Sequence, residues 1–131
     1  MKTHMGEDML KYVEPVINKD DIISSAQVVR NIRVNDDLIE YVVNILEKTR
    51  ENDKVILGIS QRGGLALISV ARSLAAMDGR EYVLPDDIKK AAPFVCSHRL
   101  ILKNSERIKE NPENRVMEQI LSEVPVPTEE L

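Results

Sequence analysis

Apolar residues recur every three to four positions along much of the chain, which is the spacing of a helix that buries one face. A first helix is predicted over residues 20–31, with Asn18 or Asp20 as its N-cap. A second is predicted over residues 36–51, with Asn35 as the N-cap and two aspartates in the first turn, where negative charge is favourable. The pattern therefore indicates helices rather than strands as the main elements.

The most apolar stretch predicts a third helix over residues 60–78. Its apolar side chains cover so much of the circumference that we expect this helix at the centre of the domain. Ser60 is its natural N-cap, and Gly79 is expected just past its C-terminal end.

A fourth helix is predicted over residues 85–98, with Pro85 at its first position. Pro93 is expected to kink or shorten this helix, because proline cannot donate the internal hydrogen bond. At most a tiny strand pairing is expected, near Val34 and Val83.

The C-terminal part is less regular. Residues 99–102 fit a helix and a short strand equally well, and a short helix is expected before a proline-bearing acidic tail. The predicted fold class is all-α, a small helical bundle of about four main helices plus a short C-terminal helix. The predicted boundaries are a leading segment at residues 1–19, a helical domain at 20–102, and a polar connection, short helix and tail at 103–131.

The composition fits one domain with an aliphatic core. The chain has 131 residues, of which 43% are hydrophobic and only 3% are aromatic. Its 22 acidic and 18 basic residues give a formal net charge of −4. Sequence-independent nucleic-acid binding depends on neutralising phosphates, so we expect no nucleic-acid partner.

Cysteine usage and hydropathy favour a cytoplasmic protein. Cys96 is the only cysteine, so no intramolecular disulfide can form, and we expect an intracellular chain. No apolar run approaches the roughly 20 residues that a membrane span needs. The N-terminal stretch MKTHMGEDML also lacks the apolar segment of a signal peptide. Membrane insertion is therefore not expected.

Common catalytic signatures are absent from the sequence. There is no G-x-x-x-x-G-K-[ST] loop to cradle phosphates, and His4 and His98 are far apart without an obvious set of metal-ligand partners. Cys96 lies two residues before His98, and residues at that spacing on a helix point to different faces. We therefore expect no catalytic residue and no metal site, and interpret Cys96 as a small core residue.

The third helix opens with three unfavourable residues, Arg62, Gly63 and Gly64. A glycine costs a helix about 1 kcal/mol relative to alanine, and a cation is disfavoured at the positive end of the helix dipole. After the Ser60 N-cap and Gln61, the free N–H groups of this turn attract anions, and Arg62 adds a charged planar fork. One interpretation is a phosphate site in which these five residues act together. The other is a solvated arginine beside glycines that allow tight helix packing.

Residues 57–102 strongly resemble the C-terminal lid domain of MoxR-family AAA+ ATPases. That family shows L-G-[AG]-S-P-R-A, an Ala/Leu-rich helix, G-R-x-Y-V-x-P-x-D-[IV] and then H-R-[LI]. The counterparts in this chain are LGISQR from Leu57, GREYVLPDDI from Gly79 and HRL from His98. Flanking stretches are also similar, so the resemblance covers essentially the whole chain.

The resemblance implies a helical lid attached to a larger α/β nucleotide-binding core, and it implies a role for Arg62. The arginine at this position of the family is the sensor-2 residue, which touches the nucleotide phosphates. Three positions depart from the family pattern. Gln61 replaces a proline, and Gly63 stands in place of the family's usual small residue after the arginine. Leu84 replaces a common threonine, whose hydroxyl would cap the fourth helix and stabilise it by roughly 1 kcal/mol.

The resemblance also implies the setting in which the lid acts. It implies ATP and Mg²⁺ as ligands of the full-length protein, a ring of neighbouring subunits that is usually a hexamer, and chaperone-like remodelling or maturation of client proteins. Partners with von Willebrand factor A domains are common in the family. The P-loop, the Mg²⁺-holding acids and the arginine finger are missing from these 131 residues. Phosphoryl transfer needs those parts, so we expect a lid without its core, with no bound cofactor and no ATPase activity of its own.

Two other interpretations remain open. The chain could be a stand-alone helical adaptor that binds proteins and never meets a nucleotide. It could also be the lid of a related AAA+ protein, such as a magnesium-chelatase subunit or a replicative helicase. The GR-YV-PDD and HRL elements fit the MoxR family better.

Overall fold

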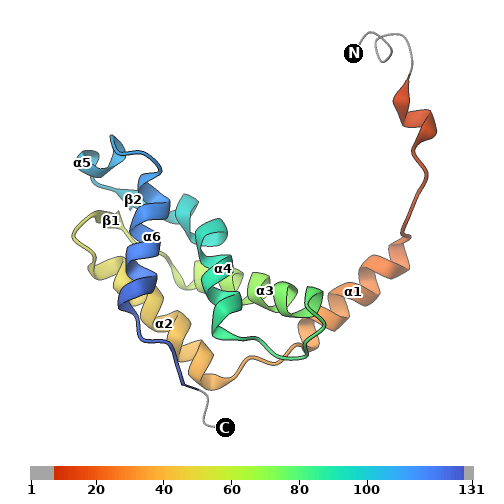
Figure 1. Ribbon diagram of the computed structural model, residues 1–131, viewed down its shortest axis with the longest axis horizontal. Coiled ribbons are helices and arrows are strands. Elements are labelled where there is room, and N and C mark those ends of the chain that lie inside the picture. Colours follow the sequence, from red (N-terminus) through yellow and green to blue (C-terminus); the bar gives the residue numbers. More distant parts are fainter. Residues whose placement is uncertain (1–7, 129–131) are drawn as a thin grey trace.

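Helices dominate the structure, a computed structural model that describes residues 8–128 (Figure 1). Its α-helices are α1 (Lys19–Asn31), α2 (Asp36–Glu51), α3 (Gln61–Met77), α4 (Pro85–Cys96), α5 (Asn104–Arg107) and α6 (Pro112–Glu123). The shorter elements are the 3-10 helices η2 (Met9–Tyr12) and η3 (Ser97–Arg99) and the strands β1 (Val55–Leu57) and β2 (Ile101–Leu102). The predicted all-α class is confirmed. None of the described helices is both long enough and apolar enough to cross a membrane.

Local capping chemistry sets the helix ends. The Asn18 side chain accepts a hydrogen bond from the Asp21 N–H at 2.9 Å and begins α1. The Asn35 side chain accepts from the Asp37 N–H at 3.3 Å and begins α2. Gly79 follows α3 with a φ of +74°, a left-handed conformation that favours glycine. These ends depend on neighbouring residues only, and the sequence predictions for them are confirmed.

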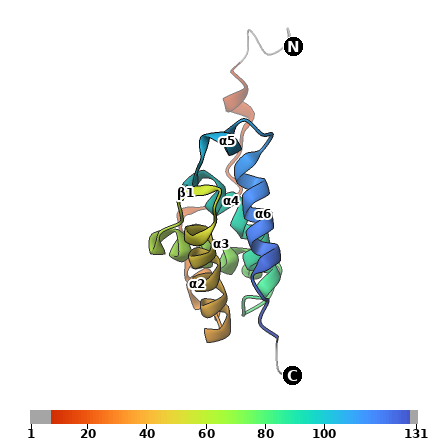
Figure 2. The ribbon, with the colours of Figure 1, turned by 90° about the vertical axis from the view of Figure 1, so that its left-hand side faces the viewer.

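Helix α3 lies at the centre of the bundle, as predicted, and contacts α1, α2 and α4. Helix α6 packs against α2 and α4, and Figure 2 shows α2 and α6 side by side. The fully buried side chains of the four central helices include Ile45, Leu67, Ile88, Met117 and Ile120, which belong to one cluster. The helical packing therefore continues past residue 102, the predicted boundary, and includes α6.

Helix α1 forms where it was predicted but is not buried. It contacts α3 and extends away from the other helices (Figure 1). None of its residues is buried, and Ile22 and Ile23 on its apolar face are 59% and 47% exposed. Only Val29 is half-buried. Periodicity identifies a face that can be buried, but not whether the fold supplies a surface to cover it.

The sheet joins two segments that lie far apart in the chain. Strands β1 and β2 are antiparallel, and Val55 pairs with Leu102. The sequence of residues 99–102 fitted a helix and a strand equally well. In the structure Arg99 ends η3, and Ile101 and Leu102 form β2. Neither strand is long enough to show an alternating pattern, so the sequence did not reveal the pairing.

The pairing expected near Val34 and Val83 is an isolated bridge. It is parallel and joins Arg33 to Tyr82, one residue earlier on both sides. The Arg33 N–H donates to the Glu81 carbonyl and the Val83 N–H donates to the Arg33 carbonyl, both at 2.9 Å. The bridge therefore ties the α1–α2 link to the α3–α4 link.

Helix α4 tolerates an internal proline. It continues through Pro93 to Cys96 and then tightens into η3, two residues short of the predicted end. At its start, Pro85 occupies the first turn as predicted. Leu84 supplies no side-chain cap, but its N–H donates to the Asp87 carboxylate at 2.8 Å. One aspartate thus fastens the start of α4.

Candidate anion-binding site

The first turn of α3 is anchored by two hydroxyl side chains. Ser60 is the N-cap, and its Oγ accepts from the Gly63 N–H at 3.4 Å while its carbonyl accepts from the Gly64 N–H at 3.2 Å. One residue earlier, the Ile59 N–H donates to the buried Thr49 Oγ1 at 3.0 Å. The loop that leads into α3 is thereby fastened to α2.

Two backbone donors of this turn remain free. The N–H groups of Gln61 and Arg62 make no hydrogen bond within residues 8–128. The Arg62 side chain is exposed and forms no ion pair with a carboxylate of the described residues. Free N–H groups at the positive end of a helix attract anions. The turn therefore presents two N–H donors and one unpaired guanidinium.

The glycines after Arg62 have a packing role. Gly63 and Gly64 are both buried. A Cβ on Gly63 would collide with Cγ2 of Ile59, and a Cβ on Gly64 would lie 2.7 Å from Cδ1 of Leu46 on α2. The absence of side chains lets α3 approach α2 and its own incoming loop. The geometry therefore supports tight packing as the reason for both glycines.

Two further arginines, from other elements, lie close to the start of α3 or to the loop that leads into it. Arg50, in the last turn of α2, donates its Nε–H to the Ile59 carbonyl at 3.2 Å, and its Cγ lies 2.7 Å from the Cβ position of Gly58. The Cδ of Arg99, in η3, lies 3.4 Å from the Cβ position of Gly63. The sequence prediction missed both. For Arg99, the sequence signal that could have identified it was its place in the HRL element.

Residues 47–120 match the family model of the AAA lid domain, which is more than half of the chain. The chain belongs to the AAA lid domain family. The matched stretch of this AAA lid begins within α2 and ends within α6, so it contains the first turn of α3 and both Arg62 and Arg99.

The AAA lid also has relatives among curated proteins. It is 38% identical over 120 residues to the uncharacterised protein YeaC of Bacillus subtilis, and 31% identical over 121 residues to the chaperone MoxR1 of Mycobacterium tuberculosis. It is 29% identical over 106 residues to a magnesium-chelatase subunit ChlI homologue of Methanocaldococcus jannaschii. These matches cover 92, 86 and 80% of the chain but only 38, 32 and 26% of the relatives. The predicted likeness to a MoxR lid is confirmed.

A solved structure shares the fold of the AAA lid. The crystal structure of a candidate ATPase from Cytophaga hutchinsonii matches with a TM-score of 0.83 at 24% identity. The match covers 97% of this chain and 41% of that one. At this identity the likeness concerns the fold alone.

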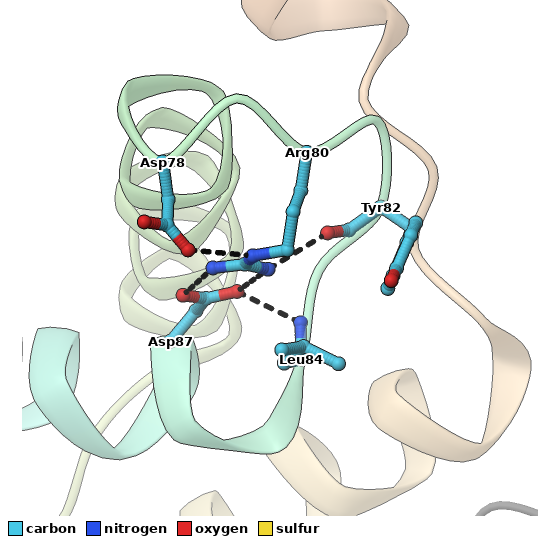
Figure 3. Close-up of polar contacts among 5 residues, drawn as sticks. All are labelled: Asp78, Arg80, Tyr82, Leu84 and Asp87. Atoms are coloured by element: carbon cyan, nitrogen blue, oxygen red, sulfur yellow. Dashed lines mark hydrogen bonds and ion pairs between the residues drawn. The ribbon is translucent and has the colours of Figure 1, made fainter.

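A second polar cluster of the AAA lid joins the end of α3 to the start of α4 (Figure 3). Arg80 donates to both carboxylate oxygens of Asp87, from Nη1 at 2.8 Å and from Nη2 at 2.7 Å. Its Nε donates to Asp78 at 3.0 Å, and Nη1 also donates to the Tyr82 carbonyl at 3.0 Å. The guanidinium is therefore occupied within the domain, in contrast to that of Arg62.

The same cluster shifts the pKa values of its members. Asp87 is only 3% exposed, and burial alone would raise its pKa. Hydrogen bonds from Arg80 and from the Leu84 N–H outweigh this effect and lower the pKa of Asp87 below its ordinary value. The hydrogen bond to Asp87 in turn raises the pKa of Arg80. Both groups stay charged, as a structural ion pair requires.

Among the described residues, the remaining candidates for chemistry do not form a site. Cys96 is buried as predicted, and burial raises the pKa of its thiol to about 11, although the nearby Arg99 acts in the opposite direction. His98 is exposed in η3, and His4 lies outside the described residues. Within residues 8–128, no three His, Cys, Asp or Glu side chains gather to hold a metal ion.

A hollow of about 1030 Å³ lies elsewhere in the AAA lid, along the N-terminal half of α2. Its lining includes Asp37, Glu40 and Tyr82, so two carboxylates face it. Tyr41 also lines it, and its buried hydroxyl has no hydrogen-bond partner among the described residues. Burial and the charge of Asp86 raise the pKa of Tyr41. The carboxylates make this hollow less suited to phosphate than the turn at Arg62.

Proposed function

We propose that this chain is the nucleotide-sensing lid of a MoxR-type AAA+ ATPase, in which Arg62 contacts the phosphates of ATP. The observation that carries the proposal is the exposed, unpaired guanidinium of Arg62 beside the free N–H groups of Gln61 and Arg62. An arginine fork and the N–H groups of a helix N-terminus match phosphate oxygens in charge and in hydrogen bonding. The membership of the AAA lid family supports the assignment.

Residues 8–128 fit the phosphates of ATP but not its Mg²⁺. The described residues contain no metal-binding cluster. Transfer of a phosphoryl group requires metal ions and further positioned charges. We therefore assign Mg²⁺ binding and hydrolysis to a nucleotide-binding core of the same protein, in keeping with relatives of which this chain spans only 38, 32 and 26%.

The proposed switch depends on a difference in contact between two nucleotide states. The Arg62 guanidinium has a phosphate partner in the ATP state and loses that partner after hydrolysis and phosphate release. A contact that exists in only one state shifts the position of the lid relative to the core. In a ring of subunits, which we propose to be a hexamer, the shift reaches the neighbouring subunit.

The proposed outcome of this movement is chaperone-like remodelling or maturation of client proteins in the cytoplasm. The similarity to a protein named chaperone MoxR1 supports this part of the proposal. Proteins with von Willebrand factor A domains are proposed as partners of the protein in this remodelling.

The test is ATP turnover by the protein that joins this lid to its nucleotide-binding core. Arg62→Ala should lower turnover at least about tenfold, because a charge-assisted hydrogen bond of roughly 1.5–3 kcal/mol is lost from the transition state. Arg62→Lys should also lower turnover, since a point charge does not reproduce the planar fork.

The matched control for this test is Arg30→Ala, which removes an exposed arginine in the last turn of α1 that forms no ion pair within residues 8–128. It should leave turnover unchanged. The folded state should tolerate Arg62→Ala, with a change in unfolding free energy within roughly 0.5 kcal/mol. Normal turnover in both Arg62 variants would refute the proposed role, and a large loss of stability would make Arg62 a structural residue.

A further inference from the structure

The hollow of about 1030 Å³ beside α2 has walls from three segments that lie far apart in the chain. One wall is the N-terminal half of α2, the second is the link between α3 and α4, and the third is the extended tail after α6. Figure 1 shows the tail passing beside the start of α2. Ligand pockets usually measure roughly 300–1,000 Å³, so this hollow has room for more than one side chain.

The α2 wall of the hollow is acidic. Asp37 and Glu40 lie three residues apart on α2, a spacing that places both carboxylates on one face of the helix, where they repel each other. Neither forms an ion pair within residues 8–128. Arg33 is the single cation of the described lining, and Asp86 adds a further negative charge near Tyr41. The balance of charge therefore favours a positively charged ligand.

The hydroxyl of Tyr41 is a second feature of the hollow that calls for a ligand. Tyr41 lines the hollow and is only 1% exposed, and its hydroxyl has no hydrogen-bond partner among the described residues. A buried polar group without a partner is costly. Burial and, to a smaller extent, the charge of Asp86 raise the pKa of Tyr41, so the hydroxyl stays protonated and can both donate and accept.

The other two walls are mostly apolar and offer an extended backbone. They consist chiefly of Tyr82, Val83, Pro85, Pro125, Val126 and Pro127. The two tail prolines keep the tail extended, because each fixes its own φ and restricts the residue before it. The backbone of Val126, between them, makes no hydrogen bond within residues 8–128. Such walls suit the aliphatic stem of a lysine or arginine and the backbone of a second extended chain.

We propose that this hollow binds an extended peptide segment that carries a lysine or arginine side chain. The cationic head lies between the carboxylates of Asp37 and Glu40 and donates to the hydroxyl of Tyr41, which in turn donates to a carbonyl of the peptide. A divalent metal is a poorer occupant, because no three His, Cys, Asp or Glu side chains gather among the described residues. The hollow shares no lining residue with the first turn of α3, so the inference does not depend on the role of Arg62.

The competing explanation is that a buried water completes the hydrogen bonding of Tyr41 and that the carboxylates are only solvated. The two explanations differ in what the removal of single atoms does to peptide binding. Tyr41→Phe removes the hydroxyl alone and should leave the fold intact, because the hydroxyl bonds to no described residue. Glu40→Gln removes one negative charge from an exposed side chain of nearly the same shape.

The experiment follows the backbone amide resonances of the isotope-labelled chain during titration with acetylated hexapeptides of alternating alanine and lysine, or alanine and arginine. The amides of Asn44 and Val126, on two different walls, should shift along a saturable curve. The same peptide with glutamate in place of lysine should give no saturable shift. Glu40→Gln should weaken binding of the basic peptides about fivefold or more, and Tyr41→Phe about threefold or more.

Glu47→Gln is the matched control, because Glu47 is an exposed carboxylate of α2 outside the lining that forms no ion pair within residues 8–128. It should change binding by less than about twofold. Equal weakening by Glu40→Gln and Glu47→Gln would overturn the proposal in favour of diffuse attraction.

The remaining outcomes also decide the question. Stationary Asn44 and Val126 resonances at millimolar concentrations of both basic peptides would overturn the site. Unchanged binding in Tyr41→Phe would overturn the contact to the hydroxyl and favour a buried water. Spermidine, a small cation without a peptide backbone, separates charge from backbone, and binding of spermidine as tight as that of the basic peptides would overturn a peptide as the occupant. None of these results bears on Arg62.

Discussion

At the scale of single residues, the glycines near the start of α3 differ in what surrounds them. A Cβ on Gly58 would meet the backbone N and Cα of Arg50 at 2.9 Å, and these atoms belong to α2. A Cβ on Gly64 would meet Cδ1 of Leu46 at 2.7 Å, the free end of a flexible side chain. Backbone atoms of a packed helix move less readily than a side-chain methyl group, so the two positions should respond differently to the same substitution.

Gly58→Ala should lower the free energy of unfolding by about 2 kcal/mol or more, because α2 must shift to admit the methyl group. Gly64→Ala should change it by less than about 1 kcal/mol, because the gain in helix propensity offsets the displacement of Leu46. Urea unfolding followed by circular dichroism measures both. Equal losses in the two variants would contradict the packing that the structure shows.

Part of the candidate site could be predicted from the sequence for a simple reason. Ser60 and Arg62 act within one turn of helix, so their residue types and spacing are enough to place them. Arg50, from α2, contacts the loop that leads into α3, and Arg99, from η3, lies beside Gly63. This proximity exists only after the chain has folded. The packing role of Gly64 likewise depends on Leu46, which lies on another helix.

At the scale of elements, α1 and α6 show that similar helices can contribute differently to stability. They have 13 and 12 residues and both are amphipathic. Helix α6 buries Val116, Met117 and Ile120, whereas α1 buries no residue. The stability of the domain should therefore depend on the apolar side chains of α6 and hardly on those of α1.

Met117→Ala should cost about 2–5 kcal/mol, the usual result of leaving a cavity in a core. Ile22→Ala should cost no more than about 0.5 kcal/mol, because a side chain that is 59% exposed loses little contact. Chemical denaturation of the chain gives both values. A loss for Ile22→Ala comparable to that of Met117→Ala would mean that α1 is buried in solution.

The stability contributed by the Arg80–Asp87 ion pair, which joins α3 to α4, should decrease in acid. A carboxyl whose pKa is lower in the folded than in the unfolded state stabilises the fold above its unfolded pKa, and the stabilisation is lost as the pH falls through the folded-state pKa. The pKa of Asp87 is lowered from an ordinary value of 3.8, so its contribution should be intact at neutral pH and should fade below about pH 4.

Asp87→Asn should therefore reduce the thermal midpoint at pH 7 and should flatten its decline below about pH 4, since the group that titrates there is gone. Thermal unfolding between pH 7 and pH 2.5 measures this effect. Asp86→Asn, at an exposed position of the same helical turn, is the control. Parallel pH profiles for the unaltered chain and Asp87→Asn would refute the contribution of the ion pair.

Helices and strands differed in how far the sequence could predict them. Helices α1, α2 and α3 each carry their own apolar face and a capping side chain, such as Asn35 or Ser60, and α4 begins with Pro85, so local information sufficed. The pairing of Val55 with Leu102 joins segments on opposite sides of α3 and α4 in the chain, and no local pattern records it. The exposure of α1 was missed for the same reason, because burial is decided by what packs against a face.

At the scale of the whole molecule, α3 connects the proposed phosphate site to the link beside α1. Its N-terminal turn carries Arg62, and its C-terminal end continues into the link that bonds to Arg33 after α1. A helix of 17 residues is about 25 Å long and moves as one body. A displacement caused by phosphate at the proposed site would therefore be passed along α3 to the link beside α1.

The purified chain should not hydrolyse ATP, because the described residues offer an arginine and helix N–H groups but no metal-binding cluster. A coupled assay with Mg²⁺ and ATP should give the rate of a protein-free blank. Turnover that disappears in a variant such as Arg62→Ala would show that these residues hold catalytic machinery. Turnover that persists unchanged in every variant would indicate a contaminating enzyme.

The position of Cys96 makes the molecule convenient for spectroscopy. It is the only cysteine of the chain, it is fully buried, and burial raises its pKa to about 11. A thiol of this kind stays protonated and shielded near neutral pH, so maleimide reagents react with it slowly. A cysteine introduced on the exposed face of α1 would then be labelled selectively in the natural background. A fluorophore placed there would report the proposed movement of the lid directly, without first removing the native thiol from the core.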